Sequence, residues 1–136
     1  LDVEDRVVSK FITQAIRGET LKIRGAGEVL DFTYVDDAAM GITQAALSDN
    51  THGKIYNITR SAEQIRTLQE AAELIISIVG NGQYQVQDRD MAFPSRGRLN
   101  IERARTDFGY DPKINIEEGF KKYHAWYLQN PTLWYR

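Results

Sequence analysis

The chemistry that this chain could carry is concentrated in five arginines that lie within seventeen residues: Arg89, Arg96, Arg98, Arg103 and Arg105. A planar guanidinium can donate two parallel hydrogen bonds to a phosphate, so convergent arginines are typical of a diphosphate site. Arg89 lies within residues 88–95, where no helical or strand period appears and a loop is predicted, and the next two arginines follow this loop. The last two fall in a predicted helix beside acidic residues, where a solvated helix face is the alternative to a phosphate role.

Three pairs of carboxylates are candidates for acid/base chemistry: Asp36 with Asp37, Asp88 with Asp90, and Glu117 with Glu118. The first and third pairs stand where helices are predicted to begin, and acidic side chains there accept free amide hydrogens and stabilise the helix dipole. Capping is therefore favoured over catalysis. The second pair has no defined partner, and hydrolysis by two carboxylates also requires a sugar cleft. We predict no catalytic residue in this chain.

The run Gly25-Ala26-Gly27 begins like a dinucleotide-binding fingerprint. Leu30 stands where the third glycine belongs, and the residues that follow are predicted to be extended, so no helix N-terminus faces a pyrophosphate. A tight turn between two strands is the favoured interpretation. No Tyr-x-x-x-Lys pair occurs, there are no cysteines, and the two histidines lack metal-binding spacing. We therefore predict neither cofactor-binding nor metal-binding residues.

These candidates must be positioned by alternating helices and strands. Helical periodicity predicts helices over residues 7–16, 38–46, 67–79, 100–107 and 116–127, with Asn100 capping the fourth. Short β-rich runs predict strands over residues 21–23, 32–35, 54–58 and 84–86. The alternation favours an α/β fold of helices with short strands, and the length of 136 residues favours a single domain over 1–136.

The amino-acid composition argues against nucleic acid and membranes as binding partners. A net charge of −2 and a pI near 5.7 give no general attraction to nucleic acid or to an anionic membrane. A nucleic-acid role for the arginine segment also lacks an aromatic platform and is the least favoured interpretation. No apolar run is long enough to span a bilayer, and the absence of cysteine favours the cytoplasm. The chain begins at Leu1, so we expect it to be part of a longer gene product.

Residues 31–37 read Asp-Phe-Thr-Tyr-Val-Asp-Asp, residues 99–104 read Leu-Asn-Ile-Glu-Arg-Ala, and residues 109–112 read Gly-Tyr-Asp-Pro. These motifs resemble the carboxyl-terminal, substrate-binding part of the extended short-chain dehydrogenase/reductase family, and the resemblance covers essentially the whole chain. It implies a parent enzyme that is a nucleotide-sugar epimerase, dehydratase or decarboxylase, an isomerase or lyase of carbohydrate biosynthesis. In that family a separate amino-terminal Rossmann half, missing here, supplies NAD or NADP and the catalytic tyrosine and lysine. The resemblance thus implies that this chain binds a nucleotide-diphosphate sugar and no cofactor.

The resemblance also implies a set of substrate-binding residues: Lys10, Phe11, Lys22, Ile23, Arg24, Arg89, Arg96 and Arg98. The helix with the first two would flank the ligand, the strand with the next three would lie along the nucleotide base, and the final arginines would reach the diphosphate. The family usually has an aromatic residue at position 24 and an arginine at position 30. Because Leu30 removes one phosphate contact, either Arg24, Arg96 or Arg98 replaces it or substrate binding is weakened.

A last implication concerns assembly. In the family, the strand that matches residues 54–58 joins the sheet of the cofactor-binding half. Without that half an unpaired edge and an apolar face are uncovered, and we expect the chain to self-associate. The alternative from another functional class is a stand-alone α/β binding or interaction module without catalytic activity, with which Leu30 is compatible.

Overall fold

The computed structural model describes residues 6–60, 66–92, 94–95 and 97–130. The chain divides into two compact units, each built from separate stretches of sequence. Unit 1 contains Leu1–Glu28, Thr67–Ser95 and Phe120–Arg136, and unit 2 contains Val29–Arg66 and Arg96–Gly119. Helices and short strands alternate along the described residues, which confirms the predicted α/β class.

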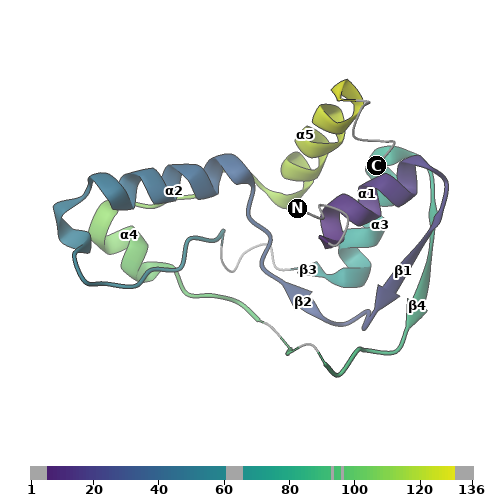
Figure 1. The fold of residues 1–136 in the computed structure, drawn as a ribbon, viewed down its shortest axis with the longest axis horizontal. Helices are drawn as coiled ribbons and strands as arrows, with labels where there is room; N and C mark the ends of the chain where they lie inside the picture. The colour runs from purple at the N-terminus through teal and green to yellow at the C-terminus, as the bar shows by residue number, and fades with distance from the viewer. Residues whose placement is uncertain (1–5, 61–65, 93, 96, 131–136) are drawn as a thin grey trace. The chain divides into compact units, whose positions relative to one another are not determined.

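Unit 1 contains two parallel strands and the helices that pack with them (Figure 1). Strand β1 (Thr20–Arg24) pairs in parallel with β4 (Gln83–Gln87), and the register places Arg24 opposite Gln87. Helix α1 (Val7–Ile16) contacts both β1 and α3 (Leu68–Val79). Helix α5 (Ile116–Gln129) contributes its residues from Phe120 onward.

Both ends of α3 follow from capping chemistry. Thr67 and Glu70 form a capping box at the start of α3: the Thr67 hydroxyl accepts the Glu70 N–H at 3.1 Å, and the Glu70 carboxylate accepts the Thr67 N–H at 2.8 Å. Gly80 then ends α3 at φ +77°, a left-handed conformation that glycine adopts without strain. The bounds of α1 and α3 confirm the predicted helices over residues 7–16 and 67–79.

The core of unit 1 is apolar and comes from α1, β1, α3 and α5. Its buried side chains are Phe11, Ile12, Ala15, Leu21, Ile23, Ala71, Ala72, Ile75, Phe120 and Tyr127. The Thr13 hydroxyl donates to the Tyr127 hydroxyl at 3.2 Å, which joins α1 to the last helix across 114 positions of sequence. The predicted apolar face of α5 is therefore packed.

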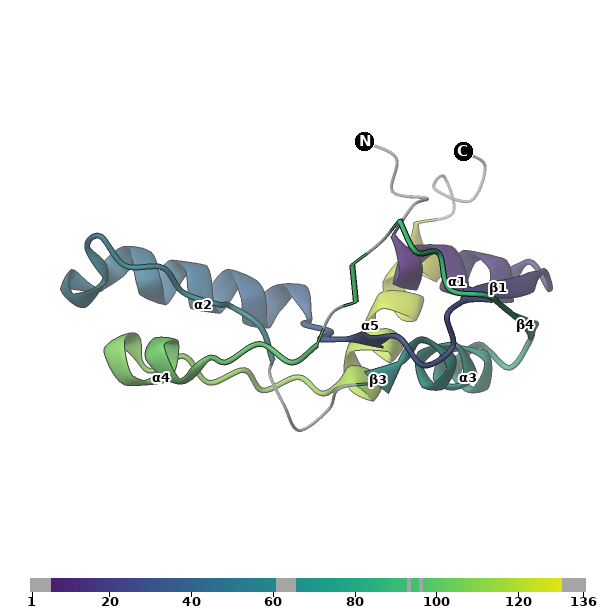
Figure 2. The same ribbon diagram turned by 90° about the horizontal axis from the view of Figure 1, so that it is seen from below.

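Unit 2 contains α2 (Val35–Leu47), a 3₁₀ turn η2 (Asp49–Thr51) and α4 (Glu102–Phe108). The two-residue strands β2 (Val29–Leu30) and β3 (Arg66–Thr67) pair with each other. Figure 2 shows α2 and α4 from a second direction; these helices contact each other. The core is a cluster of Ile101, Ala104 and Tyr110, against which Met40, Tyr56, Ile58 and Phe108 pack.

Two strand predictions in unit 2 are wrong. Residues 32–34 form no strand and Val35 already begins α2, because polar side chains bind this segment: the Thr33 hydroxyl accepts the Arg60 N–H at 3.0 Å. Residues 54–58 also form no strand. Within the described ranges no strand pairs with them, and side chains near α4 bind them instead, as when Arg103 donates to the Ile55 carbonyl at 3.1 Å.

The predicted cap of α2 is wrong as well. Tyr34 occupies the N-cap and makes no side-chain capping bond, while Asp36 and Asp37 lie inside the first turn. In contrast, Asn100 does accept the Glu102 N–H, at 2.7 Å, where α4 begins, and Gly109 ends that helix at φ +72°. None of the helices in the described parts of the chain combines the length and apolar character needed to cross a bilayer.

Candidate functional site

The candidate site lies in unit 1 where the parallel strands β1 and β4 end. Side chains alternate along β1, so Ile23 is fully buried in the core while Lys22 and Arg24 are exposed. Arg24 is opposite Gln87, the last residue of β4, and Arg89 follows two positions later. The structure thus brings Arg24 and Arg89 to the carboxyl end of one parallel pair, the edge at which open α/β sheets bind ligands.

A glycine turn closes this end of β1. Gly25 donates its N–H to the Gln87 carbonyl at 3.1 Å and adopts φ +77°. A Cβ at position 25 would lie 3.0 Å from Glu28 Cγ and 3.2 Å from Arg89 Cβ, so the missing side chain lets both residues approach. The turn leads from β1 to β2, which confirms the predicted tight turn. It is therefore not the strand–turn–helix that a dinucleotide phosphate needs.

Each of the two arginines pairs with a carboxylate. Arg89 Nε lies 2.6 Å from Glu28 Oε1, and Arg24 lies 3.8 Å from Asp90 Oδ2. The Arg24 side chain is 65% exposed and that of Arg89 is 27% exposed, so the Arg89 pair is the better shielded one. Glu28 was not identified from the sequence, because a single acid between a glycine turn and a two-residue strand carries no periodic or motif signal.

The other predicted site residues are more dispersed. Lys10 is exposed on α1, whereas Phe11 beside it is 3% exposed and packs in the core. Arg98 is exposed and belongs to unit 2, and Arg96 lies outside the described residues. Their roles toward a ligand stay predictions.

Unit 2 contains a buried carboxylate that the sequence interpretation assigned to helix capping. Asp37 is 3% exposed and accepts the N–H groups of Lys113 and Ile114 at 2.9 and 2.8 Å. Arg60 lies 3.9 Å from the same carboxylate and donates to the Pro112 carbonyl at 3.2 Å. Asp37 therefore binds the turn after α4, through bonds that span more than seventy positions of sequence.

Asp31, at the other end of the 31–37 motif, has a similar role. Its Oδ2 atom accepts the Thr59 hydroxyl at 3.1 Å and lies 3.4 Å from the Leu99 N–H donor. Burial, followed by the nearby Asp37 and Asp31 carboxylates, raises the pKa of Tyr110 to about 12. Asp31 and Asp37 of the 31–37 motif thus bind groups inside unit 2, and Tyr110 stays neutral there.

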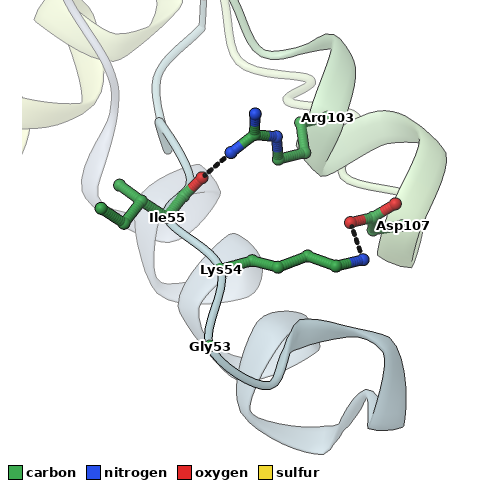
Figure 3. Close-up of a pocket in the computed structure, with 5 residues that line it drawn as sticks. All are labelled: Gly53, Lys54, Ile55, Arg103 and Asp107. Carbon is green, nitrogen blue, oxygen red and sulfur yellow. Dashed lines mark hydrogen bonds and ion pairs between the residues drawn. The ribbon is translucent and has the colours of Figure 1, made fainter.

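A pocket of about 530 Å³ also lies in unit 2, and Figure 3 shows its lining: Gly53, Lys54, Ile55, Arg103 and Asp107. The ammonium group of Lys54 and the Tyr56 hydroxyl donate to Asp107 Oδ2 at 2.8 and 2.7 Å. Arg103 points across the pocket to the Ile55 carbonyl. These polar groups bind one another. Arg103 binds the main chain of its own unit, which fits the structural alternative to a phosphate contact.

The Asp107 cluster predicts a pH-dependent stability. The hydrogen bonds from Lys54 and then Tyr56 hold the pKa of Asp107 below its ordinary value, so these bonds stabilise the fold above that value and are lost as pH falls through the lowered pKa. We expect Asp107→Asn to destabilise unit 2 at neutral pH and to match the wild type in acid. Urea unfolding of both proteins at successively lower pH measures this convergence. A destabilisation that persists unchanged in acid would contradict the ionic origin.

Residues 2–59 match the model of the NAD dependent epimerase/dehydratase family. UDP-glucuronic acid decarboxylase 1 of Danio rerio is 33% identical over 121 residues, which cover 88% of this chain and 28% of that protein. Over these residues the chain is similar to the NAD dependent epimerase/dehydratase family. The resemblance to extended short-chain dehydrogenase/reductases is thereby confirmed, and the chain spans less than a third of the length of that relative.

Solved structures agree with this similarity at the level of the fold. An epimerase, Mth375, from Methanothermobacter thermautotrophicus matches with a TM-score of 0.88 and 23% identity, over 95% of this chain and 39% of the other. The Bordetella bronchiseptica enzyme WbmF, solved with NAD⁺ and UDP, matches with a TM-score of 0.79 and 28% identity, over 97% of this chain and 39% of the other. This chain thus corresponds to about two fifths of each solved chain.

Proposed function

We propose that this chain is the part of an NAD(P)-dependent nucleotide-sugar epimerase, dehydratase or decarboxylase that binds the nucleotide diphosphate of the substrate. The observation that carries the proposal is the placement of Arg24 and Arg89 together at the carboxyl end of the β1–β4 pair. A relative named as a UDP-glucuronic acid decarboxylase and a similar structure solved with UDP support a nucleotide diphosphate as the ligand.

In this proposal the chain binds and orients, and the redox step occurs elsewhere. The nicotinamide cofactor, held by another part of the full enzyme, supplies a hydride acceptor for transient oxidation of the sugar. The arginines supply charged hydrogen bonds to the two phosphates, which fix the end of the substrate that does not react. The exposed edge around Lys22 and Arg24 lies along the base, where a guanidinium can stack on an aromatic ring.

Titration calorimetry with UDP tests the proposal on the chain of 136 residues. We expect the wild type to bind UDP more tightly than uridine, because only UDP offers phosphates to the arginines. Arg89→Ala is expected to weaken UDP binding roughly tenfold or more, as the loss of a charged hydrogen bond of about 1.5–3 kcal/mol implies.

Arg105→Ala is the matched control. Arg105 lies on α4 in an ion pair with Glu102 at 2.9 Å, so its removal changes the net charge equally without touching the proposed site. Equal affinities for UDP and uridine, or equal losses in the Arg89 and Arg105 variants, would refute the phosphate role.

A further inference from the structure

Glu28 contacts three parts of the candidate site, two through its carboxylate and one through its main-chain carbonyl. Glu28 Oε1 lies 2.6 Å from Arg89 Nε, and Glu28 Oε2 accepts the Ser95 hydroxyl at 3.2 Å. The main chain of the same residue accepts the Leu68 N–H at 2.8 Å, where α3 begins. Glu28 therefore binds side chains that stand six positions apart in the segment after β4, and it holds both against the glycine turn.

The bond to Arg89 is short, charged and directional. It uses the Nε donor, and the Arg89 Nη1 group contacts the Met91 sulfur, a weak acceptor, at 3.2 Å. A long side chain such as arginine loses about 2 kcal/mol of rotamer entropy when a ligand immobilises it. A carboxylate that already holds the guanidinium removes part of that loss before the ligand arrives, which is how preorganisation raises affinity.

We propose that Glu28 is a positioning residue that orients Arg89 for a phosphate of the ligand and also binds the Ser95 hydroxyl. The proposal rests on the proposed function, because it assigns to Arg89 the phosphate contact. Glu28 itself makes no ligand contact in this arrangement. Gly25 contributes to this arrangement, because a Cβ at that position would crowd both Glu28 and Arg89 and disturb their pairing.

The test compares Glu28→Gln with the wild type for two ligands, UDP and uridine, by titration calorimetry. We expect the variant to bind UDP about five- to tenfold more weakly, because the uncharged amide forms a weaker bond to the guanidinium and Arg89 samples other rotamers. Uridine affinity is expected to stay unchanged, since uridine has no phosphate. In an Arg89→Ala background the same substitution is expected to change UDP affinity less than about twofold, as coupling between the two side chains requires.

Glu19→Gln is the matched control. Glu19 precedes β1, is half exposed, and lies 4.0 Å from Arg17, so the variant makes the same charge change in another arginine pair of unit 1. Its UDP affinity is expected to equal that of the wild type. Hydrogen exchange without ligand provides a second readout: amides of residues 88–92 are expected to exchange faster in Glu28→Gln and not in Glu19→Gln.

The outcomes separate the two proposals. If the wild type binds UDP and Glu28→Gln binds it equally well or more tightly, the positioning role is refuted while the phosphate role of Arg89 stands. If uridine affinity falls together with UDP affinity, Glu28 supports the fold and does not position Arg89. If the wild type does not distinguish UDP from uridine, the proposed function fails, and the inference about Glu28 fails with it.

Discussion

Replacing Asp37 with alanine is expected to lower the free energy of unfolding of unit 2 by about 3–5 kcal/mol, the range found when one partner of a buried charged network is removed. The substitution leaves the Lys113 and Ile114 N–H groups without their acceptor. It also leaves Arg60, whose side chain is 17% exposed, without its carboxylate. Urea unfolding measures the loss, and hydrogen exchange at amides 113 and 114 locates it.

Asp36→Ala is a stringent control for this prediction. Asp36 stands one position earlier in the same first turn of α2 and is exposed. Its loss removes only a favourable interaction with the helix dipole, worth about 0.3–1 kcal/mol. Asp37→Asn is expected to fall between the two alanine variants, because its amide oxygen still accepts one N–H. Equal destabilisation by the two alanine substitutions would show that Asp37 acts through the dipole and not through its long-range bonds.

Gly41→Ala is expected to destabilise unit 2 by about 1–3 kcal/mol, the usual cost of overpacking a core. A Cβ at this position in α2 would lie 2.6 Å from Tyr110 Cε2 and 2.7 Å from Ile58 Cγ2. The expected sign is opposite to the gain of about 1 kcal/mol that the same substitution gives in an exposed helix. Urea unfolding followed by far-ultraviolet circular dichroism measures the change.

Thr43→Ala tests whether helix propensity or packing decides this outcome. Thr43 is exposed on α2 two positions after Gly41, so alanine there is expected to be neutral or stabilising by a few tenths of a kcal/mol. A stable Gly41→Ala protein would mean that Tyr110 moves aside, and the packing of the unit 2 core around Gly41 would then need revision.

Local signals in the sequence predicted the local structure well. The helices over residues 7–16 and 67–79, the tight turn at Gly25-Ala26-Gly27 and the helical spacing from Ile116 to Tyr127 each depend on residues a few positions apart, and each is confirmed. The phosphate-binding interpretation of the glycine turn was rejected on equally local grounds. The predicted strand over residues 84–86 appears as β4.

Long-range side-chain bonds decided what the sequence interpretation missed. Asp37 has the residue type and position of a helix cap, and only the presence of Lys113 and Ile114 some seventy-six positions later redirects its carboxylate. Residues 54–58 have the composition of a strand, but a strand needs a second strand to pair with. Here the Ile55 carbonyl accepts a hydrogen bond from the Arg103 side chain instead. The pairing of Glu28 with Arg89 is likewise invisible without the parallel register of β1 and β4.

The interleaving of the two units has a consequence for how the protein is made. Unit 1 requires its first stretch, its middle stretch and the residues from Phe120 onward, while unit 2 is assembled from the two intervening stretches. During synthesis Thr13 therefore cannot form its native hydrogen bond until Tyr127 has been added, and Asp37 cannot form its bond to Ile114 until that residue has been added. Such distant pairings slow folding because chain closure precedes any favourable contact. Unit 2 cannot be completed on the ribosome until the residues up to Gly119 have emerged, and unit 1 cannot be completed until those from Phe120 onward have followed.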